Sequence, residues 1–123
     1  MSTLQIPDEL QRLFPLSPAV FYVLFALAEG QKHGYAIMQD SRRLSEEKVH
    51  LGPGTLYSTI QRLLDFDLIE ETDGRGEPSD HENRRRYYRL TRMGRTVLAA
   101  EVRHMESVVQ LARKQKLFPG TAE

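Results

Sequence analysis

The sequence contains no cysteine, no tryptophan and no long apolar run. Without cysteine it has no disulfide framework and no Cys-based zinc site. Its longest apolar run, residues 19–28, is interrupted only by the hydroxyl of Tyr22 and is shorter than the roughly 18 residues that a membrane span requires. Residues 1–10 include Asp8 and Glu9 and no basic segment, unlike a signal peptide. We therefore expect a cytoplasmic protein that does not contact membranes.

The chain also lacks net charge, with 17 basic and 17 acidic residues among its 123. Neutrality is unusual for a nucleic-acid binder, but the charges are unevenly distributed. Positions 65–82 hold eight acids and the single Arg75, whereas six arginines and no acid occupy positions 84, 85, 86, 89, 92 and 95. This change of sign fits either charge balance across a hairpin or a basic surface for nucleic acid. Three consecutive arginines beside tyrosines favour the basic surface.

The length fits one compact domain with one additional helix, and 40% apolar residues provide a modest core. Apolar residues at helical spacing, with Ser17-Pro18 and Gly52-Pro53 as start signals, predict several short helices. We expect His33 to cap the third of them. The predicted ranges are 7–14, 18–28, 34–44 and 53–66.

The predicted helix over 53–66 has two distinct faces. Its apolar stripe consists of Leu56, Ile60, Leu63 and Leu64. At 100° per residue, the opposite face is polar and carries Gly54, Ser58, Gln61, Arg62 and Asp65. A second short helix with a glycine-flanked start and a polar outer face is typical of a helix-turn-helix.

Two strands follow, over 68–72 and 86–90, and the second is rich in aromatic residues. The loop between them, residues 73–85, is longer than the usual hairpin loop of about 2–5 residues. We interpret this hairpin as a wing. The predicted fold is mainly α with a small β-hairpin: a winged helix-turn-helix domain over residues 1–92.

The last helix is predicted to follow the cap Thr91 and to span 93–117, before a tail over 118–123. It repeats apolar residues at spacings typical of a heptad seam. Such a wide stripe is rarely left exposed, so we predict a homodimer; the alternative is that the helix folds back on its own core. The predicted seam consists of Leu98, Val102, Met105, Val109 and Ala112.

Five segments together resemble the PadR family of winged-helix regulators over about residues 16–112. They are Leu16-Ser17-Pro18, His33-Gly34-Tyr35-Ala36-Ile37, Gly52-Pro53-Gly54-Thr55-Leu56-Tyr57, Leu68-Ile69-Glu70, and the run from Arg85 to Gly94. The short length and single C-terminal helix are similar to the compact subgroup. The resemblance implies a bacterial dimeric repressor whose C-terminal helices pack across a two-fold axis, with effector control in some members.

The chain departs from the family pattern at three places. Ser58 stands where the family often has proline, and the wing loop is longer and more acidic than in many members. Some members stack a flat ligand on a tryptophan at the dimer interface. This chain has no tryptophan, so the sequence does not favour that mode.

The candidate DNA contacts lie on the helix over 53–66 and around the wing. Gln61 suits adenine, Arg62 suits guanine, and Ser58 is a further candidate for base-edge or phosphate contact. Arg84 and Arg86 share one strand face and are predicted to bind phosphates. The full predicted set is Tyr35, Gly54, Thr55, Tyr57, Ser58, Gln61, Arg62, Arg75, Arg84 and Arg86.

Four of these residues also have a structural interpretation. Arg62 could form a salt bridge with Asp65 or Glu47, and Thr55 could cap its helix. Tyr35 and Tyr57 are expected to bury their rings and offer their hydroxyls to phosphates, or to serve the core alone.

These features predict a sequence-specific repressor that binds a palindromic operator with half-sites about one helical turn apart. The alternative is a ligand-sensing or protein-interaction module without DNA. The four histidines show no metal-ligand spacing, and P-loop and nucleophile-elbow motifs are absent, so we expect no enzyme, metal or cofactor. An apolar or aromatic effector is a further expectation, held near Phe14 and Met105 or Val109.

Overall fold

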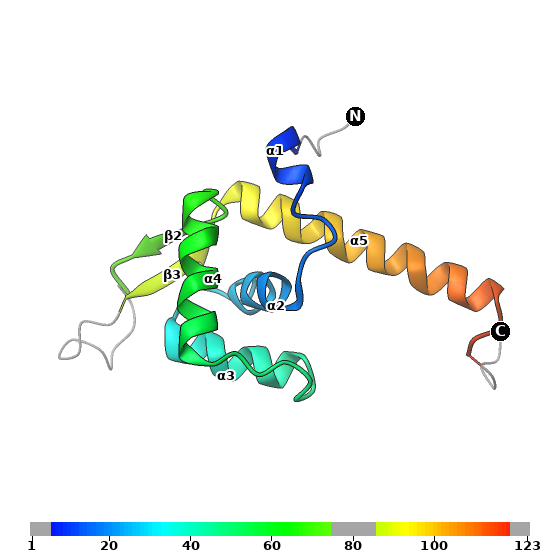
Figure 1. The fold of residues 1–123 in the computed structure, drawn as a ribbon, viewed down its shortest axis with the longest axis horizontal. Helices are drawn as coiled ribbons and strands as arrows, with labels where there is room; N and C mark the ends of the chain where they lie inside the picture. The colour runs from blue at the N-terminus through cyan, green and yellow to red at the C-terminus, as the bar shows by residue number, and fades with distance from the viewer. Residues whose placement is uncertain (1–5, 75–85, 119–123) are drawn as a thin grey trace.

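The computed structural model describes residues 6–74 and 86–118. Within these ranges the chain forms helices and a small antiparallel sheet, followed by a long final helix (Figure 1). The elements in chain order are α1 (Asp8–Gln11), α2 (Pro18–Leu27), β1 (Lys32–His33), α3 (Gly34–Leu44), α4 (Pro53–Asp65), β2 (Ile69–Thr72), β3 (Tyr87–Leu90) and α5 (Arg92–Lys114).

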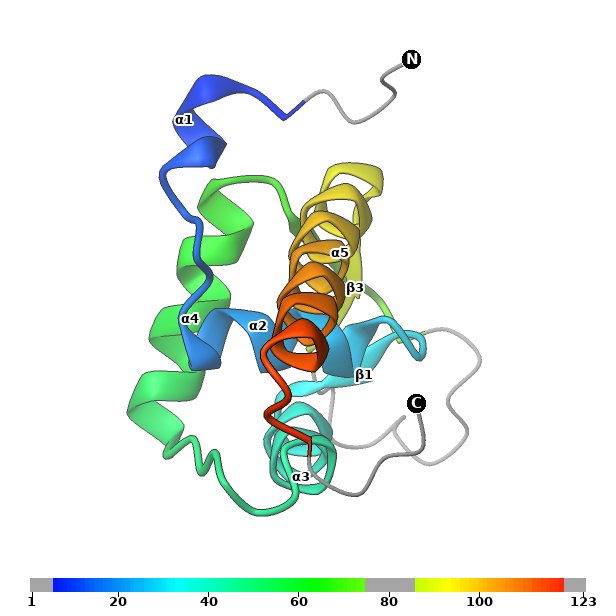
Figure 2. The same cartoon turned by 90° about the vertical axis from the view of Figure 1, so that its right-hand side faces the viewer.

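Helix α2 is the centre of the fold and packs against α3, α4, α5 and β3. Figures 1 and 2 show it enclosed by these elements. The helix starts where predicted, because the Ser17 hydroxyl accepts the Val20 N–H at 3.2 Å and Pro18 occupies the first turn. Six of its ten residues are buried. Within the described parts of the chain, neither this apolar helix nor another is long and apolar enough to cross a membrane.

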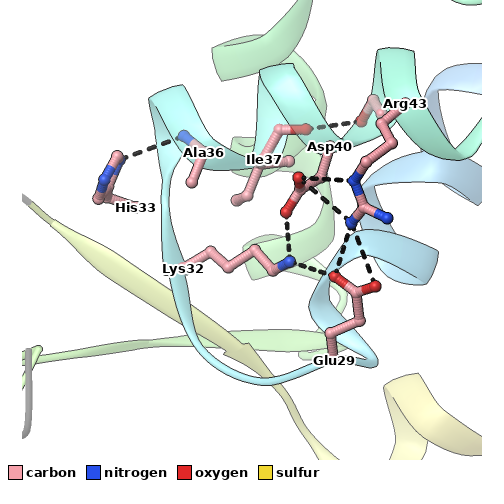
Figure 3. Close-up of polar contacts among 8 residues, drawn as sticks. Glu29, Lys32, His33, Ala36, Ile37, Asp40 and Arg43 are labelled. Carbon is pink, nitrogen blue, oxygen red and sulfur yellow. Dashed lines mark hydrogen bonds and ion pairs between the residues drawn. The ribbon is translucent and has the colours of Figure 1, made fainter.

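Helices α3 and α4 form the predicted helix-turn-helix. α3 starts as expected at His33, whose Nδ1 accepts the Ala36 N–H at 3.2 Å (Figure 3). α4 packs Leu56, Ile60 and Leu63 into the core, as its apolar stripe predicted. Figure 1 shows the N-terminal ends of both helices on the side of the molecule from which the β2–β3 hairpin projects.

A cluster of four charged residues holds α3 to the end of α2 (Figure 3). The Lys32 ammonium contacts the carboxylates of Glu29, at 2.5 Å, and Asp40. Arg43 reaches the same two carboxylates, at 3.1 and 3.3 Å. Hydrogen bonds from Lys32 and Arg43 lower the pKa of Glu29. Burial opposes the charge on Lys32, but Asp40 and Glu29 outweigh it and raise the Lys32 pKa.

The sheet has three strands in the order β1-β3-β2, one more than the predicted hairpin. β2 and β3 pair in the register Ile69↔Leu90 to Thr72↔Tyr87, and β1 adds Lys32↔Tyr88 and His33↔Tyr87 on the other edge of β3. The extra strand places the start of α3 directly beside the wing.

The short leading helix ends earlier than predicted. α1 covers only Asp8–Gln11, because the chain then tightens into bonds from Leu13 N–H to Leu10 O and from Phe14 N–H to Gln11 O. Such i→i−3 bonds belong to a 3₁₀-type turn rather than an α-helix.

The final helix α5 is buried at its start and uncovered beyond it. Thr91 caps it as predicted, accepting the Gly94 N–H at 3.0 Å. Val97, Leu98 and Glu101 are buried, whereas residues 102–118 are exposed except for the partly covered Ala112. Figure 1 shows this second part extending away from the other helices. The predicted fold class, mostly helical with a small wing and a long C-terminal helix, is confirmed.

Candidate nucleic-acid interface

A hollow of about 250 Å³ opens between the N-terminal turns of α3 and α4 and the β3 strand. Its walls combine phenol, imidazole and guanidinium groups, which suit a phosphate. Three predicted DNA contacts, Tyr35, Tyr57 and Arg86, come together there. The full lining is His33, Gly34, Tyr35, Tyr57, Arg86 and Tyr88.

Tyr35 and Tyr57 lie on the surface of this hollow rather than in the core. The two residues are 55% and 51% exposed, so the expectation that both rings are buried is wrong. Tyr35 and Tyr57 lie shortly after the N-terminal ends of α3 and α4, on helix faces that are exposed to solvent. The Tyr57 ring nevertheless rests against α3, because a Cβ at Gly34 would lie only 2.8 Å from Tyr57 Cζ. Both tyrosines thus line the hollow while staying about half exposed.

Arg86 stands beside the buried Tyr88 at the wing side of the hollow. The Arg86 side chain is 75% exposed, and its Nε lies 3.6 Å from the Glu71 carboxylate. Burial and the Glu71 charge raise the pKa of Tyr88, although Arg86 opposes this. Tyr88 therefore stays a neutral phenol, and Arg86 is the cationic group of the hollow.

The outer face of α4 is exposed and polar, as its periodicity predicted. Gly54, Thr55, Ser58, Gln61 and Arg62 all lie at the surface. Ser58 donates to the Thr55 carbonyl at 3.2 Å, and Gln61 donates to Asp65 at 3.0 Å. These are local contacts between exposed groups, which an external partner can replace.

The structural alternatives for Arg62 and Thr55 do not hold. Asp65 is engaged by Gln61 and Glu47 by Arg42, and within residues 6–74 and 86–118 Arg62 forms no ion pair. The N-cap of α4 is Gly52, and no side chain caps this helix, so Thr55 is not a cap. The predicted contacts Arg75 and Arg84 lie outside the described residues.

The predicted seam on α5 divides into two parts. Leu98 is buried in the hydrophobic core of the domain, because this turn of α5 still packs on it. Val102, Met105 and Val109 are 40–43% exposed, Ala112 is partly covered, and Val108 and Leu111 widen the same apolar surface. The alternative that the helix folds back on its own core therefore describes only its first turns.

One buried charged residue was not predicted from the sequence. Glu101, only 5% exposed, accepts the Leu16 N–H at 2.9 Å through Oε2. The one sequence signal for this burial is that Glu101 follows Val97 by one helical turn and so shares its buried face of α5. A lone glutamate in a helix is normally read as solvated.

Comparisons with known proteins agree with this geometry. The model of the PadR-like family of transcriptional regulators matches residues 23–100. A transcriptional regulator of Mycobacterium tuberculosis is 32% identical over 103 residues, which cover 80% of this chain and 86% of that protein. A 37.1 kDa protein in transposon TN4556 of Streptomyces fradiae is 37% identical over 87 residues, or 71% of this chain; the chain spans only 23% of that relative's length.

A solved structure shows the same fold. The transcriptional regulator from Clostridium thermocellum superposes with a TM-score of 0.63 at 26% identity, and the alignment covers 89% of this chain and 97% of that one. The Mycobacterium tuberculosis and Clostridium thermocellum proteins are both transcriptional regulators, in agreement with the expectation that this chain is a regulator and not an enzyme. Because the family model covers more than half of its length, the chain belongs to the PadR-like family of transcriptional regulators.

Proposed function

We propose that this protein is a homodimeric repressor that binds a palindromic DNA operator. The observation that carries the proposal is the exposed polar face of α4 beside the hollow of Tyr35, Tyr57 and Arg86. A helix with such a face fits the major groove of B-DNA, which admits one α-helix.

The two parts of this surface have different tasks. Ser58, Gln61 and Arg62 reach base edges or the adjacent phosphates, while Gly54 and Thr55 let the start of α4 approach the duplex. The hollow receives a backbone phosphate, with hydroxyls from the tyrosines and charge from Arg86. From the sequence, we expect Arg75 and Arg84, which lie outside the described residues, to bind phosphates as well. Contacts to phosphates set the register of the protein, and contacts to bases provide sequence specificity.

The exposed stripe of α5 supplies the dimer interface. Two copies that pair through Val102, Met105, Val109 and Ala112 bury an apolar surface that is otherwise in water. A two-fold dimer presents two α4 helices, and these match a palindromic operator whose half-sites lie about one helical turn apart. In the proposed regulation, a small apolar or aromatic effector binds the repressor and releases it from the operator.

Selection from random DNA tests the proposal directly. We expect the purified full-length protein to enrich an inverted repeat, and to shift a labelled duplex that carries it at a stoichiometry of two chains per site. A reporter placed behind this operator should be expressed less when the protein is present. Failure to enrich any duplex would favour the interaction module without DNA, and higher reporter expression would make the protein an activator.

The salt dependence of binding tests the hollow. Arg86→Ala removes one phosphate contact per subunit, so the slope of log affinity against log salt should fall by about one per subunit. Arg89→Ala is the matched control: it lies in β3, three residues after Arg86, but its guanidinium pairs with Glu70 at 2.6 Å and lines a different cavity. An equal effect of the two substitutions would remove Arg86 from the interface.

A further inference from the structure

A second cavity, of about 540 Å³, lies between the N-terminal segment and α5. It shares no lining residue with the hollow beside α4, since its walls come from the residues around α1 and from the middle of α5. Its volume is within the range of about 300–1,000 Å³ that is typical of small-molecule sites. The lining residues are Ile6, Gln11, Phe14, Pro15, Ala100, Glu101 and His104.

Most of this wall is apolar, and Glu101 is the acidic group in it. The Glu101 side chain is more than nine-tenths buried. Among the residues that the structure describes, its hydrogen-bond partner is the Leu16 N–H, at 2.9 Å from Oε2. A carboxylate has about four acceptor positions, and one neutral N–H leaves most of them unused.

A buried carboxylate in this state carries a free-energy cost. Burial of an ionised group is unfavourable unless the group is paired and hydrogen-bonded. A cation that enters the cavity lowers this cost, because a charge-assisted hydrogen bond is roughly twice as strong as a neutral one. The apolar walls around Phe14 and Ile6 accept a hydrocarbon or an aromatic ring at the same time.

We propose that this cavity binds a small organic cation, namely a protonated amine attached to an apolar or aromatic body. The ammonium group contacts the Glu101 carboxylate, and the ring packs between Phe14, Pro15 and Ala100. This inference rests on the proposed function, because it assigns the effector of the repressor a chemical class and a site within one protomer.

The position of the cavity explains how a bound ligand affects other elements of the fold. Leu16, which donates to Glu101, directly precedes Ser17, the cap of α2. The ligand thus lies where the segment before the central helix meets the helix that carries the exposed stripe. Occupancy sets how closely these two elements approach each other.

Two isosteric probes test the charge requirement. Isothermal titration calorimetry on the full-length protein compares 2-naphthylmethylamine, which is protonated at neutral pH, with the neutral 2-naphthylmethanol. We expect the amine to bind about tenfold or more tightly than the alcohol, as one charge-assisted contact implies. Equal affinity of the two probes would overturn the proposal.

Two variants locate the site. Glu101→Gln retains an acceptor for the Leu16 N–H but loses the charge, and it should abolish the preference for the amine. Glu106→Gln removes an exposed charge from the same helix and should leave the preference unchanged. If Glu101→Gln keeps the preference, or if Glu106→Gln removes it, the assignment to Glu101 is wrong.

A cavity-filling variant covers the case in which Glu101→Gln does not fold. Ala100→Met narrows the cavity and leaves Glu101 in place, so both probes should bind less tightly. Undiminished binding would place the ligand elsewhere and overturn the site.

DNA binding by the unliganded protein is measured on the same samples. Intact operator binding without amine binding contradicts this inference alone. Amine binding without operator binding contradicts the proposed function and leaves the cavity as a ligand site.

Discussion

The Tyr57 ring occupies the space that a side chain at Gly34 would need. A Cβ on residue 34 would lie 2.8 Å from Tyr57 Cζ and 3.1 Å from Cε1. The two helices of the helix-turn-helix thus touch at a point where only glycine leaves room. The atoms in conflict belong to the end of a side chain that can turn, so a larger residue at position 34 would displace the Tyr57 hydroxyl rather than the backbone.

Gly34→Ala is therefore expected to weaken DNA binding while the fold stays intact. Gly34 is the first residue of α3, where the roughly 1 kcal/mol advantage of alanine over glycine in a helix interior does not apply in full, so the free energy of unfolding should change little. A hydrogen bond to a charged group contributes about 1.5–3 kcal/mol, so operator affinity should fall about tenfold or more. Fluorescence anisotropy with a labelled operator measures the loss.

Tyr57→Phe provides the matched comparison for this substitution. It removes the same hydroxyl and should cost a similar affinity, and the double variant should lose little more than either single variant. If the losses of operator affinity in this double-mutant cycle are additive, Gly34 and Tyr57 act separately.

Gly94→Ala should instead destabilise the fold. A Cβ there would lie 2.9 Å from the carbonyl carbon of Leu68 and closer still to its oxygen. A backbone carbonyl cannot turn away as a phenol ring can, and overpacking of this kind costs about 1–3 kcal/mol. Urea denaturation measures the change, with Gly54→Ala as the control because no atom lies within 4 Å of its Cβ. A urea midpoint for Gly94→Ala equal to that of the wild type would contradict the close packing of residue 94 against the Leu68 carbonyl.

Charged residues on the exposed stripe should separate the proposed dimer. The double substitution Val102→Asp and Met105→Asp places two buried charges in each half of the interface, which is strongly unfavourable. We expect monomers by sedimentation velocity and a large loss of operator affinity. Ser107→Asp, on the opposite side of α5 at 100° per residue, should remain dimeric. A double variant that stays dimeric would move the interface elsewhere.

The charged cluster beside α3 predicts a loss of stability in acid. The pKa of Glu29 is lowered by its hydrogen bonds to Lys32 and Arg43. Its contribution is therefore complete above its ordinary pKa of 4.5 and is lost as the pH falls through the lower value of the folded state. Because Glu29 is exposed, solvent screens this contribution, which should not exceed about 1 kcal/mol.

Glu29→Gln isolates this effect. Urea midpoints of the wild type and the variant should differ at pH 7 and converge below pH 4.5. A difference that persists at low pH would mean that the charge of Glu29 does not stabilise the fold.

Local signals in the sequence predicted the main helices well. α3 was expected over 34–44 and spans Gly34–Leu44, and α4 was expected over 53–66 and spans Pro53–Asp65. Caps and first-turn prolines lie within a few residues of the helix ends that they determine. Ser17, His33 and Thr91 all accept the expected backbone N–H group.

Features that depend on distant contacts were missed. β1 is only Lys32–His33, too short to show an alternating pattern, and it forms because β3 offers a free edge 56 residues later, where Lys32 pairs with Tyr88. Glu101 is buried because Leu16, 85 positions away, meets it. The heptad pattern also placed Leu98 in the dimer seam, since periodicity along one helix does not show where the domain ends.

Because only the first turns of α5 are buried, a small rotation there displaces the exposed end of the helix by a larger distance. Its first turns pack on the sheet and on α2, whereas residues 102–118 are exposed apart from the partly covered Ala112. With 23 residues it is about 34 Å long. A rotation of about 5° at its first turns moves the far end by about 3 Å, by the same geometry. In the proposed dimer such a tilt changes the separation of the two DNA-reading helices, while the pitch of the duplex stays constant.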